Sequence, residues 1–149
     1  MRQIEIIKFQ PEHMIKLCKS TIVEGGVGND QQTAIWAKAR FESGPAYTGM
    51  YNGRIVGCGG VTIYWEGVGQ AWSVFPKWVR LFKREAFCYV KKGLDIVLEE
   101  HNLHRIEATW RTDYPQDMKW LEHLGFKREC LMEKYCPDGC GAYLYSIVR

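Results

Sequence analysis

The stretch "MKWLEHLGFKREC", Met118–Cys130, contains the most informative local pattern of the chain. Pro115 lies just upstream, where proline suits the first turn of a helix, and Gly125 follows the last apolar residues, where glycine often ends one. The residues after Gly125, "FKRECLMEKY" (126–135), are typical of a β-strand. The stretch therefore predicts a short helix, a glycine stop and a strand, in that order.

The segments on either side of this unit extend the pattern. A final strand, "AYLYSIVR" (142–149), follows the turn residues "PDG", and "RIEATWR" (105–111) alternates with Ile106, Ala108 and Trp110 on one face. The preceding helix carries one apolar stripe at helical spacing. The residues of this stripe are Phe82, Ala86, Tyr89, Val90, Leu94 and Val97.

The first half of the chain begins with helices and ends with a hairpin. "NG" at 52–53 joins two strand-like runs and is the strongest hairpin signal in the sequence. The predicted elements of this half are a strand at 3–9, helices at 11–23 and 29–42, and strands at 46–51, 54–65 and 70–75. The full order, β-α-α-β-β-β-α-β-α-β-β, predicts an α/β protein with a mixed sheet and helices on both of its faces.

Length and composition indicate one ordinary globular domain over residues 1–149. The N-terminus, "MRQIEIIKF", is too short and too charged for a signal peptide. No apolar run approaches the ~20 residues that a membrane span needs. We therefore expect a cytoplasmic location, no contact with membranes and reduced cysteines.

The six cysteines fall into two groups. Cys18, Cys58 and Cys88 lie within apolar patterns and are predicted to be core residues. A second group near the C-terminus has the spacing C-x5-C-x3-C, which matches no common zinc site. We therefore expect no metal, and "CPDGC" (136–140) is at most a pair of neighbouring thiols.

A basic segment follows the strand at 70–75, in "VFPKWVRLFKREAF" (74–87). Residues 76–92 hold six Lys or Arg and one acidic residue, Glu85, although the whole chain has a net charge of only +3. That net charge is too small to indicate nucleic-acid binding by itself. The segment is either a solvated helix face or an anion site, because unpaired N–H groups at a helix start attract phosphates.

The element order resembles that of the GNAT family of acyl-CoA-dependent N-acetyltransferases, over nearly the whole chain. "MKWLEHLGFKREC" resembles the family's penultimate helix and the strand after it, and "MYNGRIVGCGGVTIY" (50–64) its second and third strands. "WSVFPKW" (72–78) is similar to the end of the fourth strand. The resemblance implies a GNAT fold, a twisted mixed sheet of about seven strands with about four helices, and an acetyltransferase that uses acetyl-CoA and an amine acceptor.

The same resemblance implies where the cofactor and the catalytic groups lie. The fourth strand would bind the pantetheine arm, and the start of the next helix would bind the pyrophosphate. The implied cofactor-binding residues are Trp72, Ser73, Val74, Lys77, Arg80, Lys83 and Arg84. Glu107, on the polar face of its strand, is the candidate general base, and Tyr114 the candidate acid. A surface ion pair for Glu107 and simple packing for Tyr114 are the structural alternatives.

The sequence departs from the family pattern at two places. The phosphate loop, R/Q-x-x-G-x-G/A in the family, falls on "VRLFKR" (79–84), which has no glycine, and Leu121 replaces a Tyr that often protonates the thiolate. The stretch "QAWSVFPKWVRLFKREAF" (70–87) also resembles a segment of small GNAT-like proteins of short-tailed bacteriophages. Some of these phage proteins are classed with internal virion or DNA-ejection proteins. The alternative function is therefore a non-catalytic phage protein, in the virion or the host cytoplasm, acting through protein or nucleic-acid contacts.

Overall fold

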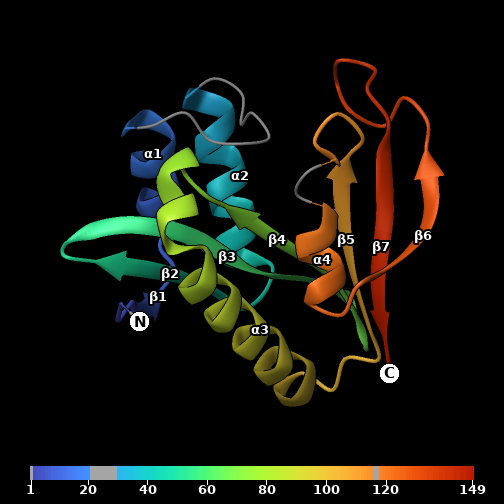
Figure 1. The fold of residues 1–149 in the computed structure, drawn as a ribbon, viewed down its shortest axis with the longest axis horizontal. Helices are drawn as coiled ribbons and strands as arrows, with labels where there is room; N and C mark the ends of the chain where they lie inside the picture. Colours follow the sequence, from blue (N-terminus) through green and yellow to red (C-terminus); the bar gives the residue numbers. More distant parts are fainter. Residues whose placement is uncertain (1, 21–29, 116–117) are drawn as a thin grey trace.

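The computed structural model describes residues 2–20, 30–115 and 118–149. Seven strands form one sheet, four α-helices flank it, and a 3-10 helix, η1, precedes the third of them (Figure 1). In chain order the elements are β1 (Glu5–Lys8), α1 (Pro11–Ser20), α2 (Asp30–Glu42), β2 (Ala46–Tyr51), β3 (Arg54–Trp65), β4 (Val68–Val74), η1 (Lys77–Phe82), α3 (Lys83–Glu100), β5 (Arg105–Arg111), α4 (Met118–His123), β6 (Lys127–Met132) and β7 (Ala142–Val148).

The sheet has the strand order β1-β2-β3-β4-β5-β7-β6. Neighbouring strands are antiparallel except β4 and β5, which are parallel and are connected by η1 and α3. The predicted mixed sheet of about seven strands is thus confirmed. Among the described helices, none is both long and apolar enough to cross a membrane.

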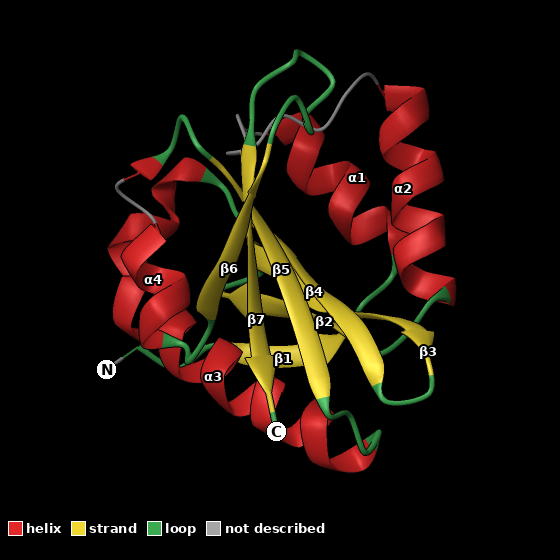
Figure 2. Cartoon of the chain, turned by 90° about the vertical axis from the view of Figure 1, so that its right-hand side faces the viewer, coloured by secondary structure: helices red, strands yellow, loops and turns green. Residues whose placement is uncertain are grey.

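Helices cover both faces of the sheet, as the sequence predicts (Figure 2). On one face, α1 and α2 bury Phe9, Leu17 and Ala37 against Cys58 of β3. On the other, α3 and α4 bury a larger cluster against β3, β5 and β7. The most deeply buried members of this second cluster are Ile106 and Tyr145, each 0% exposed, and Leu124, 1% exposed.

Two glycines with positive φ lie at element boundaries that the sequence predicts, one at the end of α4 and one in the turn between β2 and β3. Gly125 has φ +104, and its N–H and that of Phe126 bond to the carbonyls of Glu122 and Leu121, which closes α4 with a Schellman motif. Asn52 and Gly53, with φ +47 and +75, form the predicted hairpin turn between β2 and β3.

The glycines of "GCGG" (57–60), in β3, allow close packing against this strand. A Cβ atom on Gly57 would collide with the Phe75 ring, and one on Gly60 with the backbone of Pro45 and Ala46. Gly60 pairs with Ala46 in the β2–β3 ladder. These glycines therefore let the chain after α2, and the residue after β4, lie directly against β3.

Three predictions about local structure need correction. Cys88 is exposed and is not a core residue, because it lies on the outer side of α3. The basic segment begins as the 3-10 helix η1 and becomes α-helical only at Lys83. The strand predicted to reach Tyr135 ends at Met132, and Lys134 has the left-handed φ of +52. Residues 21–23 of the first predicted helix lie outside the described part of the chain.

Candidate active site between β4 and β5

The two parallel strands separate after a short common stretch. β4 and β5 pair only at Val68 with Arg105, Gly69 with Ile106 and Gln70 with Glu107. Beyond these three pairs, residues 71–74 of β4 and 108–111 of β5 diverge. The backbone polar groups on their facing edges are therefore available to something other than the neighbouring strand.

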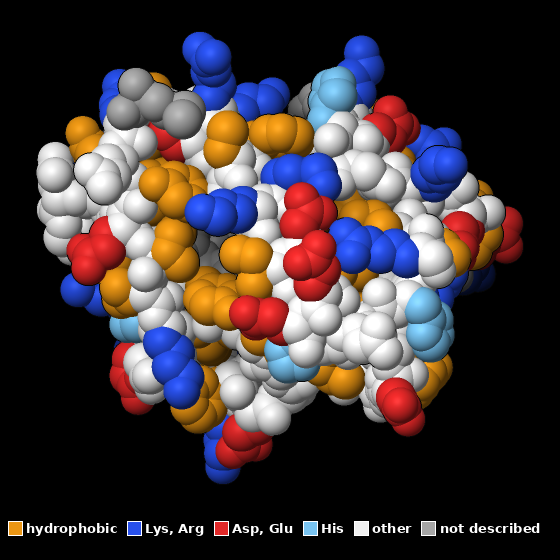
Figure 3. Space-filling model, turned by 90° about the horizontal axis from the view of Figure 1, so that it is seen from below, with side chains coloured by type: hydrophobic (Ala, Val, Ile, Leu, Met, Phe, Trp, Pro, Cys, Tyr) orange, Lys and Arg blue, Asp and Glu red, His pale blue; other side chains and the backbone are white. Residues whose placement is uncertain are grey.

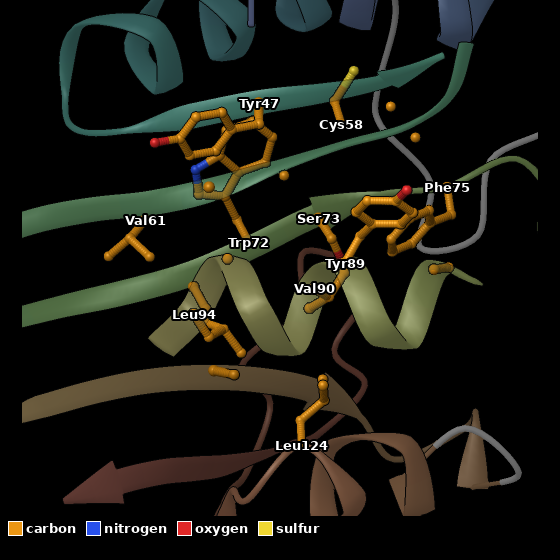
Figure 4. Close-up of a pocket in the computed structure, with 18 of the residues that line it drawn as sticks. Tyr47, Cys58, Val61, Trp72, Ser73, Phe75, Tyr89, Val90, Leu94 and Leu124 are labelled. Carbon is orange, nitrogen blue, oxygen red and sulfur yellow. The ribbon is translucent and has the colours of Figure 1, made fainter. Parts of the chain in front are cut away.

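A cavity of about 390 Å³ opens at this divergence and continues beneath α3, and we call it the α3 cavity. Its wall includes Ser73 of β4, Thr109 of β5 and Trp120 of α4. Figure 4 shows Ser73, Phe75 and Tyr89 gathered at one end, with Leu124 across from Val90 and Leu94. Most of the wall is apolar and aromatic, which is typical of a site that encloses a small organic ligand.

The predicted cofactor residues are distributed unevenly around this cavity. Trp72 and Ser73 belong to its lining, but the Trp72 ring also packs on the α1 side of the sheet, against Phe9, and Val74 lies on that side as well. The four predicted cations are all exposed, and none of them is among the residues that line the cavity. These cations, carried by η1 and the first turn of α3, are Lys77, Arg80, Lys83 and Arg84.

The start of α3 carries an anion of its own, which the sequence analysis did not foresee. Glu85 is 7% exposed, and its Oε1 accepts a hydrogen bond from the backbone N–H of Arg2 at 3.0 Å. The bond from its own N–H, followed by that from Arg2, lowers the pKa of Glu85. A carboxylate therefore occupies the helix end at which the sequence resemblance placed the pyrophosphate.

Replacing Glu85 by glutamine tests this arrangement through stability. The lowered pKa means that the charged form stabilises the fold above the ordinary value of 4.5, and that this contribution is lost as the pH falls below it. We therefore expect Glu85→Gln to lower Tm at pH 7, and the Tm difference from the wild type to shrink as the pH falls below 4.5 and through the lowered pKa of Glu85. Thermal unfolding followed by circular dichroism across this pH range checks this, and a Tm difference that does not change with pH would contradict it.

Glu107 lies at the vertex where β4 and β5 separate. It is the last residue of β5 that pairs with β4, and its side chain points away from the core residues Ile106 and Ala108. Its Oε1 accepts a bond of 2.9 Å from Nε of Arg105. Arg105 also donates to Glu129 with both terminal nitrogens, at 2.8 and 2.6 Å. The Arg105 guanidinium is therefore shared between Glu107 and Glu129.

The surroundings of Glu107 are polar and partly enclosed. Bonds from Arg105 and then from Ser146 lower the pKa of Glu129 to about 2. Burial, followed by the charge of Glu107, raises the pKa of Tyr64 on β3. Arg40 of α2 bonds to the Thr62 hydroxyl at 2.7 Å and lies over the Trp72 ring. This face of the sheet thus brings carboxylates and aromatic side chains to the vertex.

Two positions bear on the general acid: Tyr114, the candidate, and Leu121, which stands where the family often has a Tyr. The backbone carbonyl of Tyr114 accepts a 3.0 Å bond from the Trp110 indole, and the half-buried Tyr114 is not among the cavity-lining residues. Leu121 is 5% exposed and packs in the core beside Leu124. Within the described residues, no three His, Cys, Asp or Glu side chains gather closely enough to hold a metal ion.

Neither a protein-family model nor a curated protein sequence matches the chain. Solved structures do match its geometry. A GNAT-family acetyltransferase from Bacillus anthracis is similar with a TM-score of 0.73 and 22% identity, over 99% of this chain and 95% of the other. Ard1 from Thermoplasma volcanium gives a TM-score of 0.77 at 15% identity, over 97% of both chains. This chain has the GNAT fold.

A third solved structure is also similar in fold. A chimera of the spermidine N-acetyltransferase SpeG from Vibrio cholerae and hSSAT has a TM-score of 0.76 and 12% identity, over 98% of this chain and 95% of its own. Identities this low establish the GNAT fold and leave the chemistry to be argued from the site. The features of the site that bear on its chemistry are the divergence of β4 and β5, the α3 cavity and the position of Glu107.

Proposed function

We propose that the protein binds acetyl-CoA, or a related acyl-CoA, between β4 and β5 and transfers the acyl group to an amine. The observation that carries the proposal is the divergence of β4 and β5, which opens into an apolar cavity lined by Trp72 and Ser73. The pantetheine arm would bind the unpaired backbone groups of residues 71–74. The phosphates would bind the exposed cations Lys77, Arg80 and Lys83 rather than backbone N–H groups. Arg84, which the sequence resemblance also implied, lies on another side of α3.

The transfer itself would use groups on both faces of the sheet. The amine enters from the α1–α2 face, where Glu107 accepts a proton from its ammonium form. The neutral nitrogen then attacks the thioester carbonyl, so that a C–N bond forms and the C–S bond breaks. Backbone N–H groups near Ser73 or Val74 stabilise the oxygen that becomes negative. Tyr114 remains the candidate source of the proton that the departing thiolate takes up. The nitrogen loses a second proton as the amide forms, and this proton replaces the one that Tyr114 gave.

The alternative function, a non-catalytic GNAT-fold module, is favoured by two observations. Glu85 places a negative charge at the start of α3, and Leu121 is buried where many family members carry a catalytic Tyr. A protein of this class would bind a protein or nucleic-acid partner and release no thiol with any amine.

Binding and turnover with purified protein distinguish the two functions. We expect acetyl-CoA at millimolar concentration to raise Tm, because a ligand that binds only the folded state stabilises it. We also expect thiol release when spermidine, a lysine peptide or a peptide with a free N-terminus is added. Calorimetry and a thiol-reactive dye measure both effects. If acetyl-CoA gave neither a thermal shift nor heat, the proposed function would be wrong.

A further inference from the structure

We propose that the α3 cavity is an acyl-chain site, and that the preferred donor carries an unbranched acyl chain several methylenes longer than acetyl. This inference rests on the proposed function, because it names the acyl group that the site between β4 and β5 would transfer. It concerns the part of the α3 cavity that extends toward β2, beyond the residues of β4 that would bind the pantetheine arm.

The cavity is much longer than a two-carbon group. Its lining reaches from Thr109 and Trp110 on β5 to Tyr47 and Gly49 on β2. These strands are three spacings apart in the sheet order, roughly 14 Å at the usual strand separation. Its 390 Å³ equals the volume of about thirteen water molecules, and protein interiors leave few voids larger than one. A ligand that extends beneath α3 would use this space.

Gly93 shows that α3 leaves room for such a ligand. A glycine within a helix is unfavourable relative to alanine, so an interior glycine calls for a reason. Gly93 has neither a positive φ nor a close neighbour, since a Cβ atom placed on it would meet nothing within 4 Å. It nevertheless lines the cavity, on the same side of α3 as Ala86, Tyr89 and Val90. The missing side chain therefore widens the cavity at the middle of the helix.

The far end of the cavity is open and apolar. Ile6, Tyr47 and Ile96 line it and remain exposed, at 44%, 38% and 39% of their surfaces. Figure 3 shows hydrophobic side chains gathered around a hollow on the underside of the molecule. Lys92 is the one Lys or Arg among the described residues that line the cavity. An aliphatic chain suits this wall better than a polar or charged acyl group, whose desolvation would go uncompensated.

The decisive experiment measures the affinity for acetyl-, butyryl-, hexanoyl- and octanoyl-CoA by calorimetry. Each methylene that enters the cavity should tighten binding about fourfold, until the cavity is full. In Gly93→Phe, the new ring fills the space beneath α3, and we expect the octanoyl-to-acetyl affinity ratio to collapse to about that of a single methylene. Cys88→Phe adds a ring to the exposed outer side of α3 and should keep the wild-type ratio.

The outcomes separate this proposal from the proposed function. Equal affinities for acetyl- and octanoyl-CoA in the wild type would overturn the acyl-chain site and leave acetyl transfer intact. If no acyl-CoA bound, the proposed function would fail, and free octanoate would then serve as the probe. Octanoate binding that Gly93→Phe abolishes and Cys88→Phe preserves would still support an acyl-chain site, whereas no octanoate binding would refute it.

Discussion

Replacing Glu107 by glutamine is expected to lower kcat for acyl transfer by about 10²–10⁴-fold, the contribution typical of a positioned general base. Glutamine has nearly the same shape but cannot accept the proton of an ammonium group. Because Glu107 lies at the vertex of β4 and β5, it is the carboxylate best placed to meet an amine that approaches the opening between them. The loss should fall on kcat rather than on the affinity for the acyl donor.

Glu129→Gln is the matched control for this variant. Glu129 binds the same guanidinium as Glu107, with two bonds instead of one, and lies on β6 away from the vertex. Its replacement disturbs the ion-pair network but leaves the proposed base in place, so we expect less than a tenfold change in kcat. Steady-state kinetics at several pH values provide the comparison. Equal losses in both variants would assign Glu107 a structural role in the Arg105 network.

The fold could be predicted because its signals are local. Gly125 ends α4 through a left-handed backbone conformation, and Asn52 with Gly53 forms the hairpin turn, whatever the rest of the chain does. The alternation in "RIEATWR" likewise placed Ile106 and Ala108 in the core. The same kind of reasoning was wrong for Cys88, because four successive apolar residues, 87–90, cannot all face one side of a helix.

The candidate site could be predicted only in part, because much of it depends on contacts between distant segments. Trp72 and Ser73 were predicted as cofactor-binding residues from the position of their strand, and the structure places both in the lining of the cavity. The sequence showed Glu85 only as one acidic residue in a basic segment. Its hydrogen bond to Arg2 could not be predicted, because the two residues are 83 positions apart in the sequence. Gly93 gave no signal, because a single glycine in a helical pattern does not reveal the space beside it.

The double variant Arg80→Ala/Lys83→Ala is expected to weaken CoA binding by at least tenfold. A hydrogen bond to a charged group contributes about 1.5–3 kcal/mol, and exposure to solvent reduces that contribution. In a 3-10 helix, residues three apart lie on one line, so Lys77 and Arg80 form a row along η1, and Lys83, the first residue of α3, continues it. Ala86, which lines the cavity, follows one turn after Lys83. The row therefore leads from the cavity to the surface, where the phosphates of a bound donor would lie.

The control Arg84→Ala/Lys91→Ala removes the same charge from another side of α3. At about 100° per residue, Arg84 and Lys91 lie well away from the line of Ala86 and Val90, and Lys91 pairs with Asp95. Net charge changes equally in the two variants, so only a local row of contacts predicts different CoA affinities. Calorimetry with CoA at low and high salt measures both the affinity and its salt dependence. If both variants bound CoA as the wild type does, the cations would be a solvated helix face, and Glu85 would mark a helix start closed to phosphate.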